Sequence, residues 1–267
     1  MRILIASICI SCVLFTSCKD NKKTDAISEN ESIATTNTFA EKSMSEVKIF
    51  PIEHASAVVQ WGEITMYMDP VGGADLYAAY PEPDLILITD IHGDHLNIET
   101  LEGLDTSGSK IIVPQAVADQ LPAEFATQID VLNNGDSKER YGVTIEAIPM
   151  YNLREEAKDF HVKGRGNGYV ITLGSERIYF SGDTEDIPEM RTLKNIDKAF
   201  ICMNLPYTMT VDKAAEAVLA FKPVQVYPYH FRGRPDVSDV SEFEALVNES
   251  DPSVEVVILD WYPNDPY

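Results

Sequence analysis

One short block of the sequence concentrates side chains that bind metals. Residues 89–95 read TDIHGDH and follow the apolar run 85–89, which is typical of a strand covered on both faces. The candidate ligands are Asp90, His92, Asp94 and His95. Imidazole and carboxylate together suit zinc, iron or manganese, and Gly93 allows a tight turn between them. The block therefore predicts a divalent metal site; the alternative is a polar capping loop with solvated acids.

Two further candidate ligands follow predicted strands elsewhere in the chain. Asp183 comes just after the predicted strand Arg177–Phe180, and His230 comes just after Val224–Tyr229. Each is weak evidence alone, because an Asp after Gly is usually a turn residue and a lone His usually packs in a core. Together with residues 89–95, they predict a site where ligands from several strand ends meet.

Several segments resemble the metallo-β-lactamase superfamily. They are HAS at 54–56 with Asp69-Pro70, TDIHGDH at 89–95, SGDTED at 181–186 and YPYH at 227–230. The chain looks most similar to the branch of the ascorbate-phosphate lactonases and the N-acylphosphatidylethanolamine phospholipase D, over essentially all of residues 47–267. The resemblance implies a metal-dependent hydrolase, and its motifs are specific for the fold rather than for the substrate.

The resemblance also implies roles for individual residues. It matches Asp94, His95 and His230 to the family's second metal position, Asp183 to the carboxylate that bridges two metals, and His92 to the first metal position. One or two ions, zinc, manganese or iron, are therefore the expected cofactor.

The first metal position departs from the family pattern. Asp90 stands where the family has its first His, and residues 148–152, where a third His is expected, contain none. A carboxylate is a harder ligand than imidazole, so a position built with Asp90 should favour manganese or iron over zinc. The residues that could replace the missing imidazoles are His54, His161 and Asn152. The sequence leaves open whether this position is filled.

The chemistry that these ligands imply is hydrolysis. A bound metal lowers the pKa of its water and polarises the oxygen under attack, so an ester, lactone or phosphodiester of a small molecule is the expected substrate. Asp94 or Asp90, whichever is less engaged, could hold the water or pass its proton to the leaving group. The alternative is a lipoprotein of the same fold that has lost its chemistry and serves as a binding or scaffold module.

Basic residues near the candidate ligands indicate an anionic substrate. Lys163 and Arg165 lie in a Gly-rich segment, and Arg232 and Arg234 closely follow His230. They could form a pocket for a phosphate or carboxylate, or they could be solvated cations on a hairpin turn. The predicted substrate-binding residues are His54, Asn152, His161, Lys163, Arg165 and Arg232.

The elements that must position these residues alternate short strands with helices. The predicted strands are Val47–Ile52, Ala57–Trp61, Ile64–Met68, Leu85–Thr89, Lys110–Val113, Thr144–Pro149, Tyr169–Leu173, Arg177–Phe180, Ala199–Met203, Val224–Tyr229 and Val254–Leu259. The predicted helices are Asn97–Leu104, Gln115–Gln120, one capped by Thr210 through Phe221 and one capped by Ser241 through Val247. This pattern predicts an α/β fold, a four-layer αββα sandwich of two mixed β-sheets with helices outside.

The N-terminus predicts export and lipid anchoring. Arg2, the apolar run 3–15 and the small residues before Cys18 are typical of a secretory signal, and FTSC at 15–18 resembles a bacterial lipobox. We expect a signal peptide at 1–17, a lipidated Cys18 with a flexible tether at 18–46, and a hydrolase domain at 47–267. The expected location is the cell envelope, as a membrane-anchored lipoprotein facing the periplasm or exterior; a plain signal peptide is the alternative.

Charge and cysteine content narrow the partners. The net charge is −22, and so acidic a surface repels phosphate backbones, which argues against general DNA or RNA binding. Cys9 and Cys12 lie in the signal, so no pair remains for an intrachain disulfide, and Cys202 is expected to be buried. The oligomeric state is not indicated.

Overall fold

Two β-sheets form the frame of residues 45–263, which are the residues that the computed structural model describes. The predicted signal peptide and Cys18 lie outside the described residues. The first sheet contains β1 (Val47–Glu53), β2 (Ser56–Trp61), β3 (Ile64–Met68), β4 (Leu85–Leu87), β5 (Lys110–Val113) and β6 (Ile129–Val131), in that order. β1 to β3 pair antiparallel, whereas β3 to β6 pair parallel.

The second sheet has the same two-part construction. It contains β7 (Ser137–Arg140), β8 (Val143–Met150), β9 (Gly166–Leu173), β10 (Glu176–Phe180), β11 (Lys198–Cys202), β12 (Gln225–Tyr229) and β13 (Glu255–Val256). β7 to β10 pair antiparallel and β10 to β13 pair parallel. One hydrophobic core takes buried residues from both sheets, including Val59 and Met66 from the first and Ile171 and Phe200 from the second.

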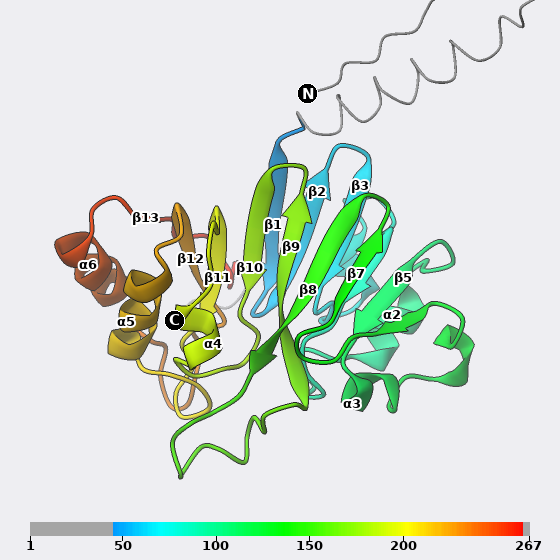
Figure 1. Ribbon diagram of the computed structural model, residues 1–267. Helices are drawn as coiled ribbons and strands as arrows, with labels where there is room; N and C mark the ends of the chain where they lie inside the picture. The colour runs from blue at the N-terminus through cyan, green and yellow to red at the C-terminus, as the bar shows by residue number, and fades with distance from the viewer. Residues whose placement is uncertain (1–44, 264–267) are drawn as a thin grey trace, which may run out of the picture. The chain divides into compact units, whose positions relative to one another are not determined.

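Helices cover the outer faces of both sheets (Figure 1). The helices are α2 (Ile98–Gly103), α3 (Gln115–Ala118), α4 (Pro188–Arg191), α5 (Val211–Phe221) and α6 (Val240–Ser250), with short 3-10 turns η1 (Ala74–Tyr77) and η2 (Ala123–Phe125). A separate apolar cluster packs Leu101 of α2 and Val117 of α3 against Ile86 and Ile111 of the first sheet. The predicted αββα sandwich is therefore confirmed. None of these described helices is long and apolar enough to cross a membrane.

The element boundaries show where local patterns were sufficient. Thr210 caps α5 as predicted, because its hydroxyl accepts a hydrogen bond from the Lys213 N–H. The predicted cap Ser241 is wrong: α6 begins after Asp239, whose carboxylate accepts from the N–H groups of both Ser241 and Glu242. The edge strand β7, with the sequence SKER, was not predicted because it lacks apolar alternation.

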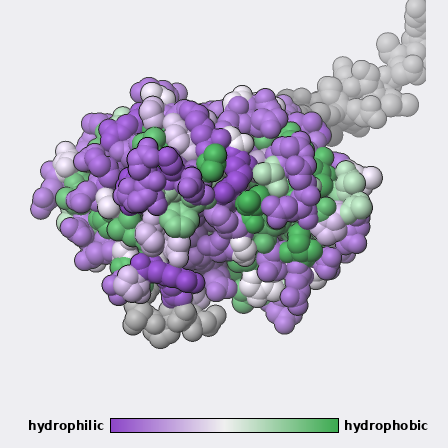
Figure 2. Space-filling model, turned by 90° about the horizontal axis from the view of Figure 1, so that it is seen from below, coloured by the Kyte–Doolittle hydropathy of each residue, from purple (hydrophilic) through white to green (hydrophobic). Residues whose placement is uncertain are grey.

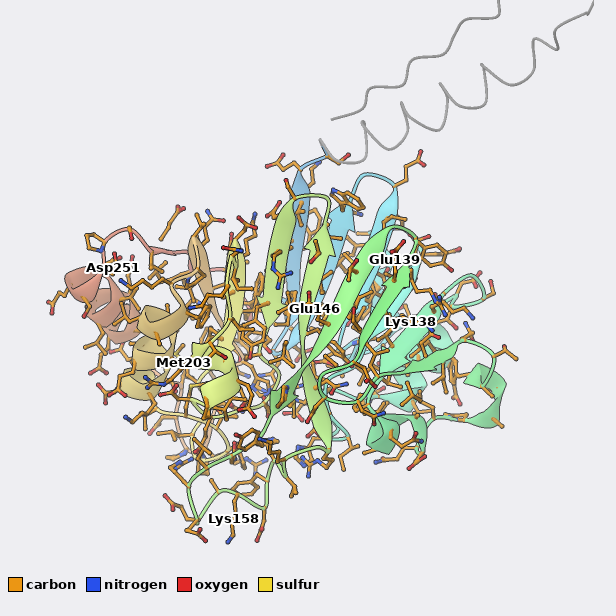
Figure 3. All side chains as sticks on the ribbon, in the orientation of Figure 1. Lys138, Glu139, Glu146, Lys158, Met203 and Asp251 are labelled. Carbon is orange, nitrogen blue, oxygen red and sulfur yellow. The ribbon has the colours of Figure 1, made fainter. Side chains whose placement is uncertain are left out.

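The parallel halves of the two sheets bring several strand ends to one edge. β3 and β4 are parallel neighbours in the first sheet, and β10, β11 and β12 are parallel neighbours in the second. Their carboxyl ends lead into Asp69, residues 88–95, Asp183 and His230. The loop that carries Lys158 lies below the same edge (Figure 3). The candidate metal-binding side chains from both sheets therefore meet here.

Candidate metal centre

Four side chains predicted as ligands converge at this edge. They are Asp94 and His95 after β4, Asp183 after β10 and His230 after β12. His95 Nε2 lies 3.2 Å from His230 Nε2 and 3.5 Å from Asp183 Oδ2. His230 Nε2 lies 3.3 Å from Asp183 Oδ1 and 3.5 Å from Asp94 Oδ2. The ligand atoms of His95, Asp183 and His230 thus lie within 4.8 Å of one another, and Asp94 joins this group through His230.

This cluster has the electrostatic character of a cation site. His95, Asp183 and His230 are buried, and Asp183 Oδ1 has no hydrogen-bond partner among the described residues. Burial opposes ionisation of Asp183, but His230 and His95 hold its pKa well below the usual range. Burial likewise opposes protonation of His95, but the carboxylates of Asp183, Asp69 and Asp94 hold its pKa well above the usual value. Because the site favours positive charge, these residues fit a divalent metal ion.

Asp69 orients His95 and was not predicted as a site residue. Asp69 Oδ2 lies 2.8 Å from His95 Nδ1. The Asp69 carboxylate also accepts hydrogen bonds from the N–H and the hydroxyl of Thr89, each at 2.7 Å. A carboxylate on Nδ1 fixes the ring so that Nε2 faces the cluster. The available signal was an acidic residue directly after the buried strand β3, a position that the sequence analysis used only as part of the resemblance.

His54 lies on the open side of the cluster. Its Nε2 is 3.4 Å from Asp94 Oδ2, and its ring centroid is 3.8 Å from that of His230. Its Nδ1 is 2.7 Å from the hydroxyl of Tyr262. Burial, together with the nearby His230, lowers the pKa of His54 to about 4. His54 is therefore neutral near pH 7, with one ring nitrogen directed at the carboxylate of Asp94.

His161 lies beside the carboxylate of Asp183. Its Nε2 is 3.1 Å from Asp183 Oδ2, its ring centroid is 5.2 Å from that of His92, and it is only 1% exposed. Neither of its ring nitrogens has a hydrogen-bond partner in the described part of the chain. Asn152, the other residue considered as a stand-in ligand, does not join the cluster. Its side-chain amide donates to the carbonyls of Ala157 and Tyr207 and so ties two loops together.

Asp90 is engaged differently from the other acids. Its Oδ1 accepts from Arg165 Nε at 3.0 Å, and its Oδ2 accepts from Arg165 Nη2 at 2.8 Å. His92 Nδ1 lies 2.9 Å from the same Oδ2. Burial opposes ionisation, but the hydrogen bonds from His92 and Arg165 lower the pKa of Asp90. Asp90 is thus a buried ion-pair partner, and its carboxylate does not line the cavity described below.

A cavity of about 390 Å³ opens above the cluster. Its lining includes His54, His92, Asp94, Phe160, His161, Asp183, Asn204, Tyr207, Arg232, Gly233 and Arg234. The molecular face on this side is mainly hydrophilic, with small apolar patches (Figure 2). Among the residues predicted to bind substrate, His54, His161 and Arg232 line the cavity, whereas Asn152, Lys163 and Arg165 do not. Lys163 instead contacts Glu189 at 2.6 Å and the hydroxyl of Tyr151 at 3.3 Å.

Known proteins share this arrangement of strands along most of the chain. The family model described as "Beta-lactamase superfamily domain" matches residues 48–230. A UPF0173 metal-dependent hydrolase from Pyrococcus horikoshii is 32% identical over 223 residues, covering 80% of this chain and 96% of that protein. A UPF0173 metal-dependent hydrolase from Methanopyrus kandleri is 27% identical, covering 83% of this chain and 99% of that protein.

Solved structures agree with these sequence matches. A Parabacteroides distasonis protein assigned as a metal-dependent hydrolase is 36% identical and superposes with a TM-score of 0.72, over 81% of this chain and 94% of that one. A metallo hydrolase from Ignicoccus hospitalis is 23% identical with a TM-score of 0.68, over 80% of this chain and 95% of that one. The second likeness, at this lower identity, is one of fold.

Proposed function

Because the chain belongs to the β-lactamase superfamily, and within it to the UPF0173 metal-dependent hydrolases, we propose that it cleaves an ester, lactone or phosphodiester bond of a small anionic substrate with a metal-activated water. The observation that carries the proposal is the group of His95, Asp183 and His230, with Asp94 next to His230, beside a cavity with room for a small molecule. Asp94 and Asp183 line that cavity. Metal-dependent hydrolysis is the shared chemistry; the bond and the substrate are our proposal.

The chain's own residues divide the work. Zinc, manganese or iron held by His95, His230 and Asp183 would supply a nucleophilic water near neutral pH and polarise the oxygen under attack. Asp69 keeps His95 in one tautomer, and Asp183 supplies the buried negative charge between the two imidazoles. These groups are fixed by backbone at strand ends, which gives the site its preorganisation.

Asp94 is the carboxylate best placed to manage the proton. Its side chain is 44% exposed and lines the cavity, whereas Asp90 is fully buried and held by Arg165. Burial opposes its ionisation, but His95, His230 and His54 hold its pKa far below the usual range, so it is ionised at neutral pH. An ionised carboxylate facing the cavity can orient an attacking water and later carry its proton toward a leaving group.

Two arginines support an anionic substrate. Arg232 and Arg234 both line the cavity, and the Arg232 guanidinium lies 4.1 Å from the centre of the Tyr262 ring. Guanidinium groups bind carboxylates and phosphates in a planar, two-point geometry. The carboxylates of Asp94 and Asp183 also line the cavity, so the two arginines are the groups there that can pair with an anionic substrate.

The test compares metal-free and metal-reconstituted protein on a panel of one aryl phosphodiester, one aryl ester and simple lactones. We expect turnover only after zinc, manganese or iron is restored, and we expect Asp94→Asn to lower kcat by about 100-fold or more, in line with general acid–base contributions. The exposed Asp75→Asn is the matched control. Full metal occupancy without turnover of any substrate would favour a binding or scaffold module instead.

We also propose that the protein is anchored at the cell envelope through a lipid on Cys18. The support is the sequence alone: a short apolar segment and small residues before Cys18, then a polar stretch. Stable attachment requires more than one acyl chain, since a single chain binds membranes only marginally. Cys18→Ser should move the protein out of the membrane fraction or leave it unprocessed. Recovery of the unaltered mature protein in the soluble fraction would rule the anchor out.

A further inference from the structure

Residues 89–95 hold two acid–histidine pairs, and both belong to groups of side chains that could bind a metal. Asp94 and His95 face the cluster with Asp183 and His230. Asp90 and His92 instead face Arg165, which is separated from Asp90 by 75 residues of sequence. Three contacts join Arg165 to this second pair: Nε and Nη2 bind both carboxylate oxygens of Asp90, and Nη2 lies 3.4 Å from His92 Nε2.

These contacts use the atoms that a metal at the first position would need. His92 places Nδ1 against Asp90 Oδ2, so Nε2 is its remaining ligand atom. Arg165 Nη2 lies 3.4 Å from that atom but donates its two hydrogens to Asp90 and Phe160, so a positive charge, rather than a hydrogen bond, stands beside Nε2. Both oxygens of Asp90 already accept from Arg165. The ligand atoms of Asp90, His92 and His161 lie within 4.8 Å of one another, so these three residues would form a second metal group if Arg165 were absent. With Arg165 in place, the ligands that its guanidinium does not contact are His161 and the shared carboxylate of Asp183. Two protein ligands are fewer than the three that catalytic metal sites use.

The charge of Arg165 works in the same direction. A guanidinium is always protonated and cannot leave the site by losing a proton. Its position is fixed, because Nη2 also donates to the carbonyl of Phe160 at 2.5 Å and the side chain is only 18% exposed. A divalent cation placed next to His92 would therefore meet a fixed positive charge within a few ångströms, in surroundings that screen it poorly.

We propose that Arg165 closes the first metal position and that the chain binds a single divalent cation, held by His95, Asp183 and His230 with Asp94 beside them. The inference rests on the proposed function, since it assumes that the second position binds metal. It is incompatible with the expectation that Asp90 is a metal ligand, so a count of bound ions separates the two.

The experiment counts metal in chelated and reconstituted full-length protein. Zinc and, separately, manganese are titrated by calorimetry, and elemental analysis follows desalting. We expect one ion per chain in the wild type and two in Arg165→Met, where Asp90 and His92 become available. Lys163→Met is the matched control, because Lys163 lies two residues away in the same loop but pairs with Glu189; it should bind one ion.

A second variant guards against misfolding of Arg165→Met, which leaves the buried Asp90 without its partner. Combining Asp90→His with Arg165→Met removes the charge pair and supplies an imidazole, and it should also bind two ions. Two ions in the wild type would overturn the inference, as would one ion in both folded variants. No bound ion in any form would instead refute the proposed function, which keeps the two failures distinct.

Discussion

The two halves of residues 89–95 carry the same residue types but differ in what surrounds them. Asp90 is hydrogen-bonded to Arg165 and His92 lies 3.4 Å from the same guanidinium, whereas Asp94 lies next to His230 and His95 next to Asp183. Asp90 is fully buried, and the Asp94 side chain is 44% exposed and lines the cavity. The comparison shows that residue type alone identifies a candidate metal ligand. Whether that ligand atom is available to a metal depends on the side chain that it contacts in the folded protein.

The largest effect should come from removing the carboxylate of Asp183, which contacts both His95 and His230. Asp183→Ala deletes the anion between His95 and His230, so metal content should fall below stoichiometric and hydrolysis by more than about 100-fold. Elemental analysis and turnover of the reconstituted protein measure this. Asp186→Asn, in the same segment but paired with Arg191, is the control. Full metal occupancy in Asp183→Ala would mean that the ligand shell is misassigned.

Breaking the ion pair between Asp90 and Arg165 should lower the free energy of unfolding without removing bound metal. Arg165→Met leaves the Asp90 carboxylate buried and uncompensated, which typically costs about 3–5 kcal/mol. Denaturant unfolding of the metal-free protein measures the change. If the double variant Asp90→Asn with Arg165→Met recovers most of the loss, the cost arises from the unpaired charge. A loss that persists in the double variant would point to packing by Arg165 instead.

Removing the metal with a chelator should lower the Tm, and the size of this decrease should differ between variants of Asp183 and of Arg165. A ligand present at about 100 times its Kd stabilises a folded protein by about 2.7 kcal/mol. For a domain of this size, removing that metal should lower Tm by about 5–10 °C. The shift should vanish in Asp183→Ala and be at least as large in Arg165→Met, which is expected to bind a second ion. An equal Tm with and without chelator in the wild type would argue against a tightly bound ion.

How much of this centre could be predicted from the sequence depends on the range of each contact. Asp183 and His230 were predicted because each directly follows a predicted strand, and the family resemblance implied their metal-binding roles. The pairing of Asp90 with Arg165 and the approach of His161 to Asp183 depend on how the loop before β9 folds back. No local pattern encodes that path, so Asp90 was predicted as a ligand and His161 as one of three stand-ins.

The sheet elements divide in the same way. Most strands with apolar alternation or continuous apolar runs were located to within a few residues, but the short edge strand β6 was not predicted. β4 ends at Leu87 rather than at the predicted Thr89, because the Thr89 N–H bonds to the Asp69 carboxylate instead of the sheet. Such a tertiary hydrogen bond ends the strand early and positions Asp69 beside His95. It cannot be predicted from hydrophobic periodicity.

A smaller effect should come from Asp69, which orients His95. Asp69→Asn keeps the shape but weakens the acceptor for His95 Nδ1, and loss of such an orienting carboxylate typically lowers metal affinity by 10–100-fold. Competition with a chromophoric chelator measures this affinity. The control is Asp84→Asn, whose carboxylate accepts from the Thr65 N–H in the same sheet, away from the metal ligands. Unchanged affinity in Asp69→Asn would reduce Asp69 to a folding role.

The smallest effect should come from Lys163, which contrasts with Arg165 two residues later in the same loop. Both were predicted from the sequence as substrate-binding cations. Lys163 is mostly exposed, and its ammonium group contacts Glu189 and Tyr151 outside the cavity lining. An exposed ion pair contributes at most about 1 kcal/mol to stability. The free energy of unfolding of Lys163→Met should therefore lie within about 1 kcal/mol of the wild-type value. KM for the best anionic substrate should not change either, whereas Arg232→Met should raise KM by about 10-fold or more through loss of a charged hydrogen-bond donor. Steady-state kinetics on the two variants with the same substrate provide the comparison. A tenfold rise in KM for Lys163→Met would mean that this side chain leaves Glu189 to reach the bound anion, as the sequence had predicted.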